Sequence, residues 1–153
     1  MKRTAMAVFR TLPRPVRRMT IRVISPTFSS GAVLALRRDD GALLFVRQRH
    51  TGGWALPGGL MNRGEPPTTA VAREVYEEVG ISLDPDELPV PFAVVSPRVR
   101  RIDIVFVCSA GPDVVAERGE DQDEVLEVGW FTTEALPDVT EPTLDILTGA
   151  RLM

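Results

Sequence analysis

Cysteine and histidine are almost absent from this chain. Its 153 residues contain one cysteine, Cys108, and one histidine, His50. A single cysteine excludes a disulfide within the chain and a cysteine-based zinc site, and it fits a reducing compartment. We therefore expect Cys108 to be a small core residue and the protein to be cytoplasmic.

Long hydrophobic runs are also lacking. No stretch of about 18 apolar residues, the length that a membrane-spanning helix needs, occurs in the chain. The first 24 residues carry six scattered arginines and two prolines, without a continuous apolar segment after the basic start. No secretory signal is predicted. We interpret residues 1–24 as a basic N-terminal extension, for which contact with a membrane surface or a partner subunit is an alternative role.

The chain also lacks a strong excess of positive or negative charge. Lysine and arginine total 18 against 21 acidic residues, giving a formal net charge of −3. This balance argues against a nucleic acid duplex as a partner. Apolar residues make up 44% of the chain, enough at this length for one hydrophobic core. We expect residues 25–153 to form a single domain.

The pattern of apolar residues predicts an α/β fold. Strands are expected at 30–37 and 42–49 as a hairpin, and at 90–96, 101–109 and 125–131, with a short extended piece at 54–57. A helix is expected at 67–79, and shorter helical pieces near 133–136 and 141–147. Both faces of 101–109 are largely apolar, which indicates a central strand. Together these elements favour a mixed sheet with helices on both faces.

The helix at 67–79 combines an apolar face with an acidic one. Pro66 and Pro67 suit its start, and Gly80 suits a left-handed C-terminal cap. With Glu74 at 0°, an ideal helix puts Glu78 near about 40° and Glu77 near about 300°. Such like charges repel each other unless a hard cation such as Mg²⁺ or Mn²⁺ lies between them. The alternative is an ordinary solvated acidic face.

A longer motif surrounds these carboxylates. Gly59 is followed after five residues by Glu65, and after seven more by Arg73-Glu74-Val75-Tyr76-Glu77-Glu78-Val79-Gly80-Ile81. This spacing resembles, without a mismatch, the Nudix box, the signature of the Nudix hydrolase family. The resemblance implies an α/β/α sandwich and hydrolysis of a phosphoric anhydride in a nucleoside diphosphate linked to another group.

The resemblance also implies roles for individual residues. Glu74 and Glu78 are expected to ligate Mg²⁺ or Mn²⁺ directly, Glu77 directly or through water, and Gly58 through its carbonyl oxygen. The same likeness makes Arg73 and Glu65 a pair that orients the loop and the helix. We count Arg73 with Glu74, Glu77 and Glu124 in the expected catalytic set. Gly59 is expected where the backbone approaches the substrate, and Gly80 is expected to be structural.

The general base is expected on an acidic loop. Family resemblance suggests a glutamate six residues before a tryptophan, and Glu124 stands in that relation to Trp130. Glu120 is the alternative, and a merely solvated loop is a third interpretation.

An anionic substrate also requires cationic side chains. Arg47 and Arg49 lie two apart on one strand face, and we select them as substrate-binding residues. The group Arg98, Arg100 and Arg101 is the alternative. His50 and Trp54 could touch substrate, but an incidental loop histidine and a packing tryptophan are equally consistent with the sequence.

The motif indicates the reaction class but leaves the substrate open. ADP-ribose-like compounds, nucleotide sugars and nucleoside triphosphates are all compatible with it. Pro97 follows Ile81 by 16 positions (97 − 81 = 16), which resembles a weak mark of ADP-ribose hydrolases. The competing hypothesis is a nucleotide-binding or regulatory module that has the fold without turnover. Members of the family are often homodimers, so a homodimer is an open alternative, and the sequence itself does not indicate the oligomeric state.

Overall fold

The structure is a computed structural model that describes residues 13, 14, 16, 27–111 and 114–153. Nearly all of the expected N-terminal extension, 1–24, lies outside these residues. The described elements are β1 (Ser29–Arg37), β2 (Leu43–Gln48), β3 (Trp54–Ala55), β4 (Gly58–Leu60), α3 (Pro67–Val79), β5 (Phe92–Ser96), β6 (Arg101–Ser109), β7 (Val125–Phe131), the 3-10 turn η1 (Thr133–Ala135) and α4 (Glu141–Gly149).

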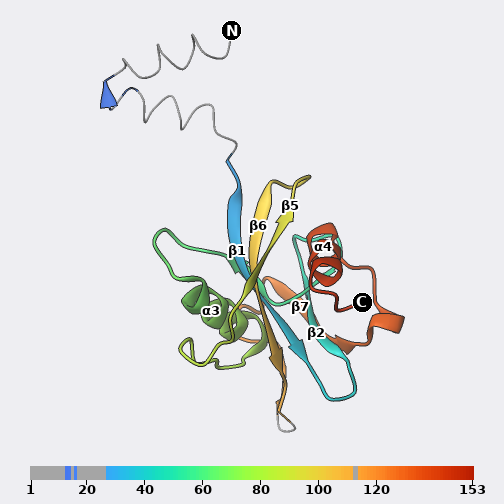
Figure 1. Ribbon diagram of the computed structural model, residues 1–153. Coiled ribbons are helices and arrows are strands. Elements are labelled where there is room, and N and C mark those ends of the chain that lie inside the picture. The colour runs from blue at the N-terminus through green and yellow to red at the C-terminus, as the bar shows by residue number, and fades with distance from the viewer. Residues whose placement is uncertain (1–12, 15, 17–26, 112–113) are drawn as a thin grey trace.

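A mixed sheet lies between the two helices α3 and α4 (Figure 1). Its main path runs β3-β2-β1-β6-β5, while β4 pairs with β1 and β7 with β2. Strands β1 and β6 are parallel, and the other paired strands are antiparallel. The predicted α/β sandwich with a mixed sheet is confirmed, as is the central position of β6. None of the helices in the described part is long and apolar enough to cross a bilayer.

The predicted hairpin between β1 and β2 exists only near its turn. Their antiparallel pairing is limited to Arg37 opposite Leu43. Further along, β2 pairs with β7 from Leu43 to Gln48, and β1 pairs with β4 from Gly31 to Val33. Two neighbouring strands that separate in this way open the sheet between them. The cavities described below are lined by residues at this opening.

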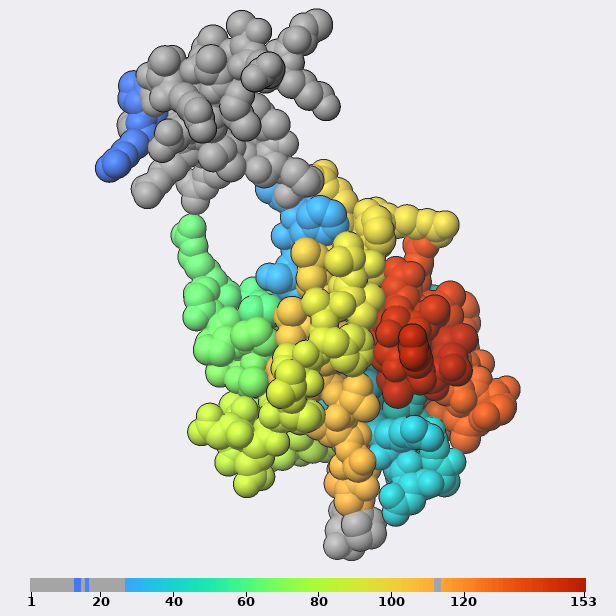
Figure 2. Space-filling view, in the orientation of Figure 1, coloured from blue at the N-terminus to red at the C-terminus, as the bar shows by residue number. Residues whose placement is uncertain are grey.

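Side chains of β1 point alternately to the two faces of the sheet and pack into two separate hydrophobic cores. Ala32, Leu34 and Leu36 pack with the apolar face of α3, whereas Val33 and Ala35 pack with Ile146 and Leu147 of α4. This is the period of two that a central strand requires. Full burial of each large apolar side chain contributes about 1.5–3 kcal/mol, so both cores fix the helices on the sheet. In the space-filling view, α4 packs beside β5 on its side of the sheet (Figure 2).

Helix α3 has the boundaries that its sequence predicts. Pro66 is the N-cap residue and makes no side-chain capping bond, and Gly80 ends the helix with φ 69°. The Gly80 N–H donates to the Tyr76 carbonyl over 3.0 Å. The helix buries Ala70, Val71, Val75 and Val79 together with one carboxylate, Glu78. A buried acid on a helix that is otherwise amphipathic requires polar partners.

Candidate active site

Acidic side chains from α3 and from a distant loop meet at one cavity of about 310 Å³. Strand ends of β2, β4 and β6 complete its walls. Its lining residues are Gln48, Gly58, Gly59, Leu60, Glu74, Glu77, Glu78, Arg101, Asp121 and Glu124. The cavity therefore joins the helix carboxylates, the backbone of β4 and one arginine.

Glu78 is the most deeply buried of these carboxylates, with 4% of its surface exposed. One oxygen accepts a hydrogen bond from the Gly58 N–H over 2.8 Å, and the other accepts one from the Gln48 side-chain amide. Burial raises the pKa of Glu78 to about 8, and repulsion from Glu74 and Glu124 acts in the same direction. The two hydrogen bonds oppose this shift without cancelling it. A cation beside Glu78 would favour its charged form.

Glu74 lies directly beneath strand β4. Burial raises its pKa, and the neighbouring Arg73 guanidinium opposes that shift. A Cβ atom added at Gly59 would overlap the Glu74 carboxylate. A side chain at position 59 would therefore displace the Glu74 carboxylate from its place against β4.

Arg73 ties the helix to the loop before it. Its guanidinium donates to Glu65 over 3.0 and 3.1 Å, to Glu74 over 2.7 Å and to the Leu60 carbonyl over 3.3 Å. It also lies 3.4 Å from a carboxylate oxygen of Glu77. The hydrogen bonds from Arg73 hold the pKa of Glu65 below its usual value. The pair of Arg73 and Glu65 expected from the family likeness is thus present in the structure.

The acidic loop is attached to the C-terminal end of α3 through its backbone. The N–H groups of Gly119 and Asp121 donate to the Glu78 and Glu77 carbonyls over 3.0 and 2.9 Å. These are carbonyls that the end of a helix leaves without partners of its own. The loop is therefore held beside the carboxylates of the same helix turn, and this attachment brings Glu124 to the cavity.

The two candidate bases differ in position. Glu124 lines the cavity, together with Asp121. Glu120 is not among the lining residues, and it accepts a hydrogen bond from the Tyr76 hydroxyl over 3.3 Å. The geometry therefore favours Glu124 over Glu120.

The candidate phosphate-binding arginines are also separated by the structure. Arg47 forms an ion pair with Glu127 across the β2–β7 ladder, and the Arg49 Nε donates to the Asp123 carbonyl over 2.9 Å. Neither residue lines this cavity or its neighbour, so their substrate role stays a prediction. Arg98 pairs with Glu141. Arg101 is the arginine that lines both cavities.

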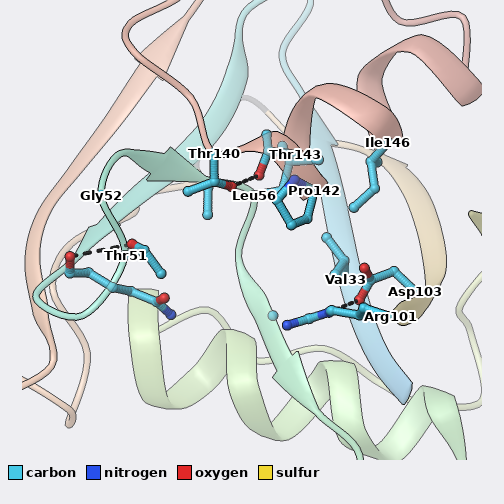
Figure 3. Close-up of a pocket in the computed structure, with 13 residues that line it drawn as sticks. Val33, Thr51, Gly52, Leu56, Arg101, Asp103, Thr140, Pro142, Thr143 and Ile146 are labelled. Atoms are coloured by element: carbon cyan, nitrogen blue, oxygen red, sulfur yellow. Dashed lines mark hydrogen bonds and ion pairs between the residues drawn. The ribbon is translucent and has the colours of Figure 1, made fainter. Parts of the chain in front are cut away.

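The neighbouring cavity has a volume of about 260 Å³ and lies against α4 (Figure 3). Its lining residues are Val33, Gln48, Thr51, Gly52, Ala55, Leu56, Gly58, Arg101, Asp103, Thr140, Pro142, Thr143 and Ile146. Gln48, Gly58 and Arg101 belong to the walls of both cavities. The two cavities are therefore adjacent, and a single extended ligand could occupy both.

Trp54 and His50 do not line either cavity. The Trp54 ring packs edge-on against Phe131, with 4.8 Å between ring centroids. This contact supports the packing interpretation of Trp54. His50 is exposed at the end of β2, and Cys108 is partly buried against the core on the α3 side.

A model of the NUDIX domain matches residues 27–148 of the chain. The chain belongs to the Nudix hydrolase family. It is 34% identical over 113 residues to a MutT-like protein of Streptomyces ambofaciens, covering 74% of this chain and 70% of that protein. It is 31% identical to the NAD-capped RNA hydrolase NudC of Escherichia coli O9:H4 (strain HS), covering 76% of this chain and 44% of that one. The chain thus spans less than half of the NudC length.

Solved structures support the same assignment. The crystal structure of a MutT NUDIX hydrolase from Burkholderia pseudomallei aligns with a TM-score of 0.65 and 28% identity, over 80% of this chain and 97% of that one. The expectation of a Nudix family enzyme is confirmed. The Nudix box of this chain therefore belongs to a member of a hydrolase family.

The residues of the box offer the donor set that a hard divalent cation prefers. Among the described residues, no three histidine, cysteine or acidic side chains already converge at ligand distance from one point. Glu74, Glu77, Glu78 and Glu124 nevertheless line one cavity, and carboxylate oxygens suit Mg²⁺ and Mn²⁺. Such a cation would also relieve the repulsion around Glu78. The residues present thus fit the metal that the family likeness implies.

Proposed function

We propose that this protein hydrolyses the phosphoric anhydride of a nucleoside diphosphate derivative, by attack of water on phosphorus and with a divalent cation. The observation that carries the proposal is the shared cavity of Glu74, Glu77, Glu78, Glu124 and Arg101. Four carboxylates beside an arginine match a metal ion together with an anionic diphosphate.

Mg²⁺ or Mn²⁺ would neutralise charge on the diphosphate oxygens and make the attacking water more acidic. Glu74 and Glu78 are the proposed direct ligands, Glu77 a direct or water-mediated one, and the Gly58 carbonyl a further oxygen donor. Gln48 and the Gly58 N–H keep the buried Glu78 carboxylate in place. Arg73 donates a hydrogen bond to Glu74 and keeps its carboxylate beneath Gly59. Arg73 is therefore proposed to position the metal ligand Glu74, and not to contact the reacting atoms itself.

Glu124 is the proposed general base. Its carboxylate takes a proton from water while the water oxygen forms a bond to phosphorus. The bridging P–O bond then breaks, and the leaving phosphate keeps the bonding electrons. The backbone hydrogen bonds between the acidic loop and α3 support this role, because they hold the loop that carries Glu124 beside the cavity. Glu74 or Glu77 would take the role if Glu124 does not.

Arg101 is the proposed phosphate-binding cation in the first cavity. Its side chain is about a quarter exposed and is held by Asp103 over 2.6 Å. A guanidinium that is fixed at one side can present its remaining N–H groups to a phosphate. Arg47 and Arg49 remain the alternative, provided that Arg47 leaves Glu127 when substrate binds.

The substrate class remains broad, and ADP-ribose is the first compound to test. The NudC relatives are named for NAD-capped RNA, and NAD itself contains a diphosphate bridge. Pro97 accepts a hydrogen bond from the Arg100 N–H over 3.3 Å in the turn between β5 and β6. This backbone contact places Pro97 in a turn, in agreement with the interpretation that it opens the turn between two strands.

A panel of diphosphates with product analysis tests the proposal. The full chain is incubated with ADP-ribose, NAD, nucleotide sugars and nucleoside triphosphates in the presence of Mg²⁺ or Mn²⁺. A nucleoside monophosphate, or pyrophosphate from a triphosphate, is the expected product. Binding without turnover on every compound would instead support a nucleotide-binding module.

A further inference from the structure

Arg101 is held by a buried carboxylate at the start of the central strand β6. Its Nε donates a hydrogen bond to Asp103 Oδ1 over 2.6 Å. Asp103 is 1% exposed, and a carboxylate buried to this degree needs a cationic or hydrogen-bonding partner. In the part of the chain that the structure describes, Arg101 is the residue that donates to Asp103. The position of the Arg101 guanidinium is therefore tied to that of a side chain fixed in the sheet.

The pairing uses one end of the guanidinium. In a bidentate pair both carboxylate oxygens accept hydrogen bonds, but Asp103 Oδ2 accepts none from the described residues. Nor does Arg101 Nη1 or Nη2 make a hydrogen bond or an ion pair with any of these residues. Figure 3 shows the far end of the Arg101 side chain pointing away from Asp103. Because Arg101 lines both cavities, its Nη groups are available to a ligand there.

Gly31 of β1 leaves the space that this arrangement occupies. It lies opposite Asp103 in the parallel register of β1 and β6, and β4 pairs with the opposite edge of β1. A Cβ atom at Gly31 would overlap both Asp103 Oδ1 and Arg101 Nη2. The φ angle of Gly31 is not in the left-handed region, so position 31 requires space and not an unusual backbone. The guanidinium thus lies over Gly31, on the way from β6 to the cavity beside β4.

We propose that Gly31 and Asp103 are positioning residues for the substrate diphosphate and act through Arg101. Asp103 fixes the Nε, and Gly31 leaves the room in which the Nη groups face the phosphates. A guanidinium that is held in place beforehand loses less side-chain freedom when it binds an anion, so the diphosphate binds more tightly. The proposal rests on the proposed function, since it requires a diphosphate beside Arg101.

A purely structural role for this pair makes a different prediction. If Arg101 served only to neutralise a buried carboxylate, disturbing the pair would lower stability and leave the affinity for a diphosphate unchanged. The positioning role predicts instead a loss of affinity that depends on the presence of Arg101. A double-mutant cycle separates the two roles, because changes that act through the same side chain are not additive.

Binding of methylenediphosphonate to the full chain in the presence of Mg²⁺, measured by titration calorimetry, tests the proposal without turnover. Its P–C–P bridge is not an anhydride, and it carries no nucleobase, so the result does not depend on which substrate is hydrolysed. Gly31→Ala and Arg101→Gln should each raise Kd about 10- to 100-fold, the effect of losing hydrogen bonds from a charged group. Gly31→Ala added to Arg101→Gln should raise Kd no further. Asp103→Leu should resemble Gly31→Ala, which decides alone if the Asp103 variant does not fold.

Gly111→Ala is the matched control, because a Cβ atom there meets nothing within 4 Å, and its Kd should equal that of the unaltered protein. Thermal melting establishes that each variant folds. An unchanged Kd in folded Gly31→Ala protein would overturn the proposal, and so would an equal rise with and without Arg101. Failure of the unaltered protein to bind the probe would overturn it as well. Absence of hydrolysis in the diphosphate panel, with the cycle as expected, would refute the proposed function alone.

Discussion

Glu124 and Glu120 offer a comparison at the scale of single residues. Both belong to the acidic loop, but only Glu124 lines the carboxylate cavity. Glu124→Gln should lower kcat by about 10²- to 10⁴-fold with little change in KM, since proton transfer matters in the transition state. Glu120→Gln should leave kcat within about twofold, since truncation of an exposed contact has little effect. Steady-state kinetics on both variants decide the assignment, and the reverse order of losses would move the base to Glu120.

Arg101 and Arg47 are the two candidates for binding the substrate phosphate, and they can be compared in the same way. Arg101 lines both cavities, whereas Arg47 is paired with Glu127 on β7. Arg101→Gln should raise KM about 10- to 100-fold, the effect of losing hydrogen bonds from a charged group. Arg47→Gln should leave KM nearly unchanged. If instead the Arg47 variant shows the larger rise, the phosphate is bound at the edge of β2 and Arg101 is structural.

Glu78 should make the stability of the metal-free protein depend on pH. Its pKa is about 8 in the folded protein against 4.5 for an unperturbed glutamate. The folded state therefore holds a proton that the unfolded chain releases, and stability falls as pH rises from 4.5 to 8. Melting temperatures of the chelated protein across this range should decrease, and Glu78→Gln should flatten the decrease. An equal slope in the variant would assign the effect to another group.

At the scale of elements, the contact between α3 and the acidic loop is the feature that assembles the site. A Cβ atom at Gly119 would overlap the Glu77 and Tyr76 carbonyls, whereas one at Gly111 would meet nothing within 4 Å. Gly119→Ala should therefore move the loop from the helix and lower kcat by about 10²-fold, the effect of a displacement near 1 Å. Gly111→Ala, with kcat unchanged, is the control. Equal rates in both variants would show that the loop is not needed for turnover.

Local signals in the sequence were enough to predict the single elements. Helix α3 begins at Pro67 and ends at Val79, just before the C-cap Gly80, because proline and glycine act on the backbone locally. Strand β6 was expected to be central because both of its faces are apolar. The branching of β1 and β2 toward different partners was not predicted, because partner choice depends on strands far away in the chain.

The candidate site divides in the same way. The glutamates of the helix belong to one short motif, so their proximity followed from helical periodicity and family likeness. Gln48, Asp103 and Asp121 were missed as residues that line the two cavities, because they come from β2, β6 and the acidic loop, which are far apart in the sequence. Asp103 did leave a signal: an acid on the face of a central strand, two residues from an arginine. Such an acid requires a partner that the apolar pattern does not supply.

At the scale of the whole molecule, two hydrophobic cores cover opposite faces of the sheet. The two cavities of the candidate active site lie where strands β1 and β2 separate. The core with α3 fixes the metal-binding carboxylates proposed above, and the core with α4 fixes one wall of the neighbouring cavity. The sheet opening between β1 and β2 joins the two. Under the proposed function, this arrangement would allow a diphosphate to lie in one cavity and its attached group in the other.

The rate of monophosphate release by the metal-free chain, before and after addition of a divalent cation, tests the central claim most directly. The substrate is the diphosphate that gives the highest rate in the panel, with ADP-ribose as the starting compound. The account predicts no turnover in excess chelator, full recovery with Mg²⁺ or Mn²⁺, and none with Na⁺, because the proposed ligands are hard carboxylate oxygens. Full turnover by metal-free protein in excess chelator would contradict it.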